Sequence, residues 1–233
     1  MIICAPDMNV EIASRFGVEP CILVTPGMRV ASRWSMKILA DIGLSGAKHG
    51  VDVAMYVAYV RSVKPTWAVV PDRFADFRAT LTQWFRYSPS ISRYVAPIFV
   101  AQVFYRYRYL DVVIDLLRLG LIERVALPLR AHHDVTCSAR PRLCAERAER
   151  ALRILCGAAR HIHLLGPALR TLRSLRYVLK QCERHDSVVS IDTSAYRMAA
   201  NNELKRRLGG RWMPRDSKEA AVMLETWLRQ ALL

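Results

Sequence analysis

Three aspartates stand at the ends of short apolar segments, where a parallel sheet would bring them together. Asp41 follows the apolar run 38–40, Asp72 follows 67–71, and Asp192 ends the run 187–191. Gln102 ends a fourth apolar segment. A charge at the end of an apolar strand is costly unless it faces a polar opening. We therefore expect these side chains to line one site, although each aspartate alone could simply cap the helix or turn that follows it.

Grouped carboxylates are suited to chemistry at a glycosidic carbon. One carboxylate attacks that carbon or stabilises its positive charge, and another moves protons. A third carboxylate or an amide can recognise the edge of a heterocycle, since a purine offers N–H donors to Asp and donor–acceptor pairs to Gln. The four residues thus favour an enzyme that cleaves or exchanges a glycosidic bond.

The elements that must position these residues alternate along the chain. Eight short apolar segments are predicted strands, at 1–5, 21–25, 38–42, 67–70, 97–101, 122–127, 161–165 and 187–192. Segments of helical period lie between them and after the last, at 9–16, 52–63, 74–85, 109–119, 139–159, 168–182, 202–208 and 216–232. This alternation is typical of a parallel sheet covered on both faces. Eight units in 233 residues predict an α/β fold, a compact (β/α)8 TIM-like barrel forming a single domain over 1–233. A doubly wound open sheet is the alternative.

The order of the motifs around these residues resembles the guanine transglycosylase superfamily. The stretches LADIGLS at 39–45 and KPTWAVVPD at 64–72 look like its first active-site strands. SIDTSAY at 190–196 resembles the strand that carries the family's nucleophile, and HLLG at 163–166 resembles the strand just before it. RWMPR at 211–215 looks like the branch of the family that acts on DNA.

The resemblance implies a function and a role for each residue. It implies a glycosyltransferase (a pentosyltransferase) that exchanges guanine in DNA for a 7-deazaguanine, preQ0-like base through a covalent Asp–nucleotide intermediate, without a cofactor. Asp192 would be the nucleophile at C1′ and Asp41 the general acid/base. Asp72 and Gln102 would hold the edge of the base, and Gly166 would leave room for it. The residues assigned to substrate binding are Asp72, Gln102, Gly166 and Gly43.

The chain departs from the family pattern in ways that bear on the substrate. Ile42 replaces the serine of the Asp-Ser-Gly turn, and the zinc signature of the tRNA enzymes is absent after Asp192. There is also no room for their additional tRNA-binding domains. The loss of the serine removes a small hydrogen-bonding residue beside the proposed acid/base. A minimal barrel without the tRNA-binding domains favours the DNA branch, or a degenerate relative with an altered substrate. Three alternatives stay open: a tRNA-directed transglycosylase, a glycoside hydrolase using the same carboxylates, and a non-catalytic nucleic-acid-binding barrel.

The charge of the chain predicts a polyanionic partner. Lys and Arg number 35 against 20 Asp and Glu, a formal net charge of +15, which favours DNA or tRNA. Aromatics alternate with arginines just after Gln102, a pattern suited to base stacking and phosphate contact, and a second basic group follows Asp192. The predicted nucleic-acid-binding residues are Tyr105, Arg106, Arg108, Arg197, Lys205, Arg206 and Arg207. Packing of the tyrosines on the barrel, or a solvated helix face, is the structural alternative.

The cysteines and histidines do not predict a metal site. The six cysteines are dispersed, which favours small buried hydrophobic residues over a disulfide framework. His132, His133, Cys137 and Cys144 match no standard zinc spacing. His161 and His163 would point to the same face of a strand.

The sequence has no run of about 18 apolar residues, the length that a membrane span needs. We therefore expect no membrane partner and a cytoplasmic protein. The oligomeric state stays open, a homo-oligomer included.

Overall fold

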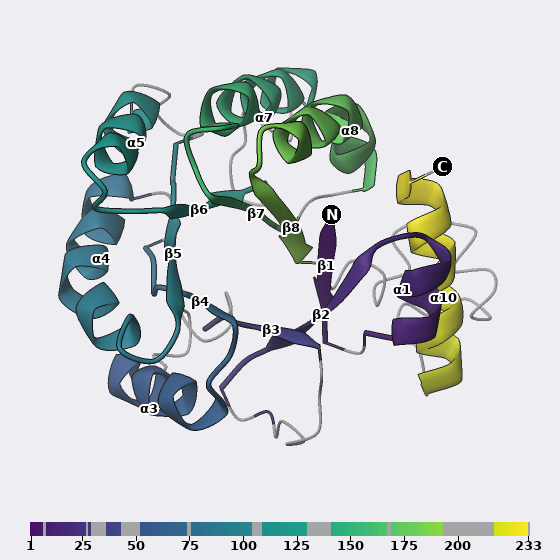
Figure 1. The fold of residues 1–233 in the computed structure, drawn as a ribbon, viewed down its shortest axis with the longest axis horizontal. Helices are drawn as coiled ribbons and strands as arrows, with labels where there is room; N and C mark the ends of the chain where they lie inside the picture. Colours follow the sequence, from purple (N-terminus) through teal and green to yellow (C-terminus); the bar gives the residue numbers. More distant parts are fainter. Residues whose placement is uncertain are drawn as a thin grey trace.

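The computed structural model describes residues 1–6, 8–26, 28, 36–42, 52–73, 76–103, 109–129, 141–166, 169–192 and 217–232. Eight parallel strands follow one another around a closed barrel, and β8 returns to pair with β1 (Figure 1). The strands are β1 (Ile2–Ala5), β2 (Glu19–Val24), β3 (Lys37–Ala40), β4 (Trp67–Val69), β5 (Ala96–Val100), β6 (Arg124–Pro128), β7 (His161–Leu165) and β8 (Val188–Asp192). The predicted TIM-like barrel is confirmed, and closure rules out the doubly wound open sheet.

Alternate residues of each strand face opposite sides of the barrel wall, because side chains in a strand alternate with a period of two. One buried cluster fills the interior, with Leu39 of β3, Val69 of β4 and Ile98 of β5 among its members. A larger cluster joins the outer faces of the strands to the helices, and Val189 and Ile191 of β8 belong to it. The strands are thus buried on both faces, which explains why their sequences are nearly continuous apolar runs.

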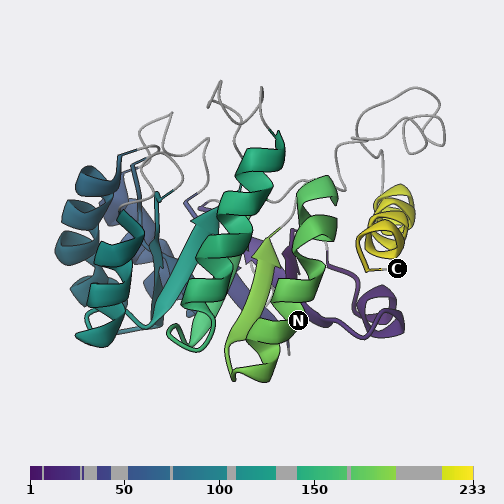
Figure 2. The ribbon, with the colours of Figure 1, turned by 90° about the horizontal axis from the view of Figure 1, so that it is seen from above.

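Helices surround the barrel as an outer layer (Figures 1 and 2). They are α1 (Val10–Arg15), α3 (Val53–Val63), α4 (Phe77–Ile91), α5 (Tyr109–Arg118), α7 (Pro141–Leu155), α8 (Leu169–Arg184) and α10 (Ser217–Leu232). Three of them begin at a side chain that accepts a hydrogen bond from the first turn: Asn9 from Ile12 N, Asp52 from Ala54 N and Asp76 from Ala79 N. Such capping satisfies backbone donors that lack a partner within the helix.

The largest difference from the predicted helix bounds is at α4. The sequence predicts a helix over 74–85, whereas α4 begins after its Asp76 cap and continues to Ile91, with Pro89 in its last turns. Phe77, Trp84 and Ile91 recur at a spacing of seven and are all buried, so packing on the barrel carries the helix past the expected end. The predicted helix at 202–208 lies outside the described residues.

The prediction of isolated buried cysteines is wrong for the four that the structure pairs. Cys4 of β1 forms a disulfide with Cys21 of β2, and Cys156, just after α7, forms one with Cys182 of α8. Register explains the first pair, because Cys4 and Cys21 lie opposite each other in neighbouring strands and both belong to the interior cluster. The second pair joins two helices that pack against each other.

Among the described residues, no helix is both long enough and apolar enough to cross a membrane.

Candidate functional site

The described candidate residues all lie at the carboxyl ends of strands, and in a closed parallel barrel these ends share one rim. Asp41 follows β3, Asp72 and Gln102 follow β4 and β5, Gly166 follows β7, and Asp192 is the last residue of β8. The contacts divide them into two groups. Asp41, Asp72 and Gln102 come from three neighbouring strands, whereas Gly166 and Asp192 come from two strands further round the barrel.

The first group is centred on a hydrogen bond between Asp72 and Gln102. Gln102 Nε2 donates to Asp72 Oδ2 over 2.5 Å. Gln102 continues the inward-facing alternation of Ile98 and Val100, and it is only 1% exposed. Its Oε1 is buried and has no hydrogen-bond partner among the described residues. A buried acceptor without a partner costs about 1–3 kcal/mol, so this oxygen is suited to an N–H donor from a ligand.

Asp72 is a weaker acid than an ordinary aspartate. Burial, and then the negative charge of Asp41, raises its pKa from the ordinary 3.8 to about 6, while the hydrogen bond from Gln102 opposes both effects. Asp41 and Asp72 follow two neighbouring strands, β3 and β4. A neighbouring like charge favours the neutral form of one of them, so Asp72 can hold a proton at near-neutral pH.

Tyr56 of α3 ties together the two strand ends that carry these aspartates. Its hydroxyl lies 2.7 Å from the Val69 carbonyl oxygen and 3.1 Å from that of Ala40, and its side chain is fully buried. Burial, and then the charge of Asp41, raises its pKa well above the ordinary value, so it is a neutral hydrogen-bond donor. The sequence analysis did not identify this role, because a tyrosine on an apolar helix face looks like an ordinary core residue.

The second group is centred on Asp192. Its carboxylate oxygen Oδ1 accepts a hydrogen bond from the backbone N–H of Gly166. Gly166 has a φ of +56°, a conformation that glycine adopts without steric cost. The sequence predicts only that Gly166 leaves room for a base. In the structure Gly166 also contacts Asp192, the predicted nucleophile. Asp192 is 14% exposed, and its Oδ1 also lies 4.0 Å from Nε2 of His163.

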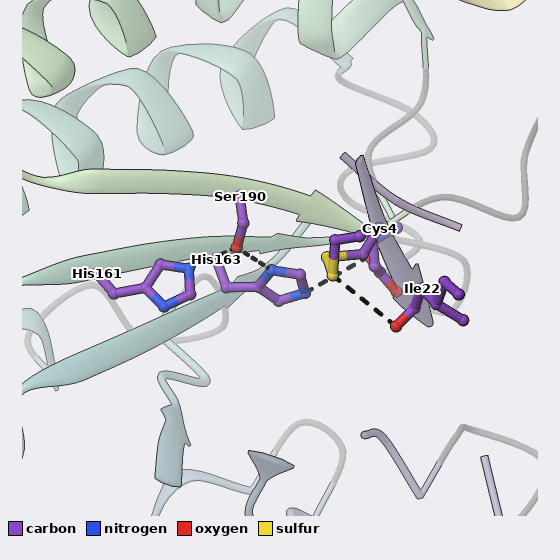
Figure 3. A network of polar contacts seen from close by, with 8 residues as sticks. Cys4, Ile22, His161, His163 and Ser190 are labelled. Carbon is purple, nitrogen blue, oxygen red and sulfur yellow. Dashed lines mark hydrogen bonds and ion pairs between the residues drawn. A yellow bond between two sulfur atoms is a disulfide. The ribbon is translucent and has the colours of Figure 1, made fainter. Parts of the chain in front are cut away.

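Below Asp192, two histidines and a serine form a chain inside the barrel. Ser190 Oγ lies 2.7 Å from His163 Nδ1 and 2.5 Å from His161 Nε2 (Figure 3). All three side chains are buried. The expectation that His161 and His163 face the same side of their strand is confirmed. The sequence did not predict Ser190 as their partner, because the pairing of β7 with β8 sets it opposite His163.

Both histidines are neutral. Burial lowers the pKa of His161 from 6.5 to about 3, and the positive charges of Arg124 and Lys37 contribute to this shift. Burial, and then His161, lowers the pKa of His163 well below its ordinary value. At the end of this hydrogen-bonded chain away from Asp192, the Trp67 ring lies 4.6 Å from the His161 ring. A neutral imidazole has one N–H donor and one acceptor, so the hydrogen bonds of this chain have a direction.

The other candidate residues lie outside the described residues. They are Gly43, Tyr105, Arg106, Arg108, Arg197, Lys205, Arg206 and Arg207. His132, His133 and Cys137 lie there too, while Cys144 belongs to α7. Within the part of the chain that the structure describes, no three His, Cys, Asp or Glu residues are grouped so that they could hold a metal ion.

The raised pKa of Asp72 predicts a pH dependence of stability. The folded protein keeps the Asp72 proton up to about pH 6, whereas an unfolded chain releases it near pH 3.8. The folded state thus binds more protons between these values, and the contribution of Asp72 to the free energy of unfolding falls as the pH rises through them. The full shift corresponds to about 3 kcal/mol. Because the Asp72 side chain is partly exposed, we expect a smaller fall.

Denaturant unfolding of the unmodified chain and of Asp72→Asn, from pH 4 to 7, measures this contribution. The difference between the two proteins isolates Asp72 from the other carboxylates. As the pH rises, the free energy of unfolding of Asp72→Asn is expected to increase relative to that of the unmodified chain. A difference that stays constant over this range would show that the environment of Asp72 does not disfavour its charge.

Comparison with known proteins assigns no family to this barrel: no protein-family model matches the chain, and no curated protein matches it significantly.

Proposed function

We propose that this chain is a guanine transglycosylase that exchanges guanine in DNA for a 7-deazaguanine base. The observation that carries the proposal is the placement of Asp41, Asp72 and Asp192 on one rim of the barrel. Asp192 is anchored by Gly166, and Asp72 is held neutral more readily than an ordinary aspartate. Carboxylates in such different environments are suited to the separate roles of nucleophile, proton carrier and base-recognition group.

The reaction would proceed in two displacements. A carboxylate oxygen of Asp192 attacks C1′, the bond from C1′ to guanine N9 breaks, and the electron pair leaves with guanine. Guanine takes, through Asp41, the proton that the interacting pair of Asp41 and Asp72 holds. The ionised Asp41 then removes a proton from the incoming base. The nitrogen of that base attacks C1′, and the ester bond to Asp192 breaks to restore the carboxylate. Each displacement inverts C1′, so the product keeps the original configuration.

The Asp72–Gln102 pair supports recognition of a purine-like edge. Gln102 Oε1 is a buried acceptor without a partner among the described residues, and a guanine-type base has N–H donors that suit it. Asp72, with its pKa near 6, can accept such a donor as a carboxylate or donate to a base acceptor as an acid. The pair thus favours a base that combines donors and acceptors on one edge.

The basic charge of the chain supports a nucleic acid as the other substrate. A net charge of +15 attracts a polyphosphate backbone, and released counterions add to its affinity. We propose DNA rather than tRNA, because the zinc signature of the tRNA enzymes is absent after Asp192. We also propose a cytoplasmic location.

The test is incorporation of a labelled 7-deazaguanine base. The purified chain is incubated with guanine-containing duplex DNA or with a tRNA transcript, together with labelled preQ0, and labelled adenine is the control base. We expect label in the DNA, one guanine released for each base incorporated, and no incorporation of adenine. Guanine release without incorporation would identify a hydrolase instead, and neither release nor incorporation with either nucleic acid would reject the proposal.

A further inference from the structure

The buried chain beneath Asp192 consists of groups that the proposed reaction does not use. His161, Ser190 and His163 follow one another inside the barrel (Figure 3). Nε2 of His163 faces Oδ1 of Asp192 at 4.0 Å. Buried polar side chains in a barrel interior are costly unless each one is satisfied. The positions of the protons on these three side chains therefore decide whether each polar atom has a suitable partner.

The charge of Asp192 and the hydrogen bond between Ser190 and His163 together determine the direction of the hydrogen bonds. His163 is neutral and carries a single N–H. If that proton were on Nδ1, the lone pair of Nε2 would face a carboxylate, which is repulsive. With the proton on Nε2, an N–H faces Asp192, and Nδ1 accepts a hydrogen bond from the Ser190 hydroxyl. Ser190 in turn accepts a hydrogen bond from His161 Nε2, so every contact has one donor and one acceptor.

Among the described residues, this hydrogen-bonded chain has no connection to solvent at His161. His161 is 2% exposed, and its Nδ1 is buried without a hydrogen-bond partner among the described residues. Its ring packs on Trp67, at the end of the chain away from Asp192. Among the described residues, no hydrogen bond leads a proton onward from His161. This arrangement favours an orienting role for these side chains.

We propose that Ser190 and His163 are positioning residues for Asp192. Ser190 fixes the Nε2–H tautomer of His163, and His163 directs that N–H toward the oxygen that Gly166 also contacts. The N–H groups of Gly166 and His163 both point at Asp192 Oδ1, and together they restrict rotation of the carboxylate about its Cβ–Cγ bond. The 4.0 Å contact is longer than a hydrogen bond, and such contacts commonly shorten when substrate binds. The catalytic part of this inference rests on the proposed function.

Ser187 provides a matched control for Ser190. It too is a buried serine, just before β8, and its hydroxyl donates to the Ala159 carbonyl oxygen over 2.9 Å and accepts from Gly157 N over 3.0 Å. These contacts are with backbone groups and do not involve the histidine chain. Ser187→Ala and Ser190→Ala thus remove the same atom from a buried position, and only the second changes the environment of His163.

The experiment combines a tautomer measurement with kinetics on the full chain. In substrate-free protein, ¹⁵N chemical shifts of the imidazole nitrogens are expected to show His163 as the Nε2–H tautomer in the unmodified chain and in Ser187→Ala. In Ser190→Ala we expect a mixture of tautomers. In base exchange, Ser190→Ala is expected to lose about 10- to 100-fold in kcat, the scale of a misplaced reactive group, with KM for the incoming base unchanged.

The outcomes separate this inference from the proposed reaction. If the tautomers are as expected but the unmodified chain does not exchange bases, the order of the hydrogen bonds would be supported and the proposed reaction rejected. An Nδ1–H tautomer in the unmodified chain would overturn the inference. A kcat of Ser190→Ala equal to that of Ser187→Ala would also overturn it, because the loss of a buried hydroxyl alone would then account for the effect.

Discussion

Asp192→Asn is expected to abolish base exchange while leaving DNA binding nearly unchanged. An amide has almost the same shape as the carboxylate and can still accept the hydrogen bond from Gly166 N–H. It lacks the charge needed to form an ester with C1′, so the covalent intermediate cannot form. Affinity for DNA depends mainly on phosphate contacts, and a residue that is only 14% exposed contributes little to these.

Incorporation of labelled base, filter binding of duplex DNA and a denaturing gel for the covalent adduct together measure this effect. Asp186→Asn is the matched control. Asp186 is an exposed carboxylate just before β8, at a φ of +59° that asparagine tolerates, and its replacement changes the net charge equally. Full exchange activity in Asp192→Asn would show that another residue, and another chemistry, is responsible.

Asp41→Asn is expected to slow base exchange by about 10²- to 10⁴-fold, the usual contribution of general acid–base catalysis. Asparagine cannot give a proton to departing guanine or remove one from the incoming base. The variant also removes the negative charge that helps to raise the pKa of Asp72. We therefore expect the pKa of Asp72 to fall in the variant, which a ¹³C carboxyl titration measures independently of activity.

The covalent adduct distinguishes the two variants. With Asp41→Asn, attack by Asp192 can proceed faster than transfer to the incoming base, so an adduct with DNA is expected to accumulate on a denaturing gel. Asp52→Asn is the control, because it removes the same charge from the neighbouring helix α3 and asparagine caps a helix as well as aspartate does. Unchanged kcat in Asp41→Asn, together with an unchanged Asp72 titration, would exclude Asp41 from the site.

The sequence was sufficient to predict the barrel, because its signals are local. Most apolar runs end at Pro, Gly or Asp, and segments of helical period separate most of them. The order of strands, and the position of Asp41, Asp72 and Asp192 at strand ends, therefore follow from the chain itself. The bounds of α4 were less predictable. Its final turns depend on the burial of Ile91 against the barrel rather than on local preference.

The contacts between strands could not be predicted in the same way. Ser190 meets His163, and Cys4 meets Cys21, only because of the register of β7 with β8 and of β1 with β2. A shift of one residue would turn each side chain to the other face of the barrel wall. A period of two does place His161 and His163 on one face, but it does not specify whether that face is the interior or the helix layer.

The pairing of β1 with both β2 and β8 has a consequence during synthesis of the chain. Ile2 of β1 lies opposite Glu19 but also opposite Ser190, a residue made 171 positions after Glu19. At 5–20 residues per second, about 9–34 s pass between the appearance of these two partners. Until β8 leaves the ribosome, β1 has one open edge, and the rim that carries Asp41 is not yet joined to the strand that carries Asp192. The growing chain therefore exposes an unpaired strand edge until β8 is made, and the complete rim forms only when β8 pairs with β1.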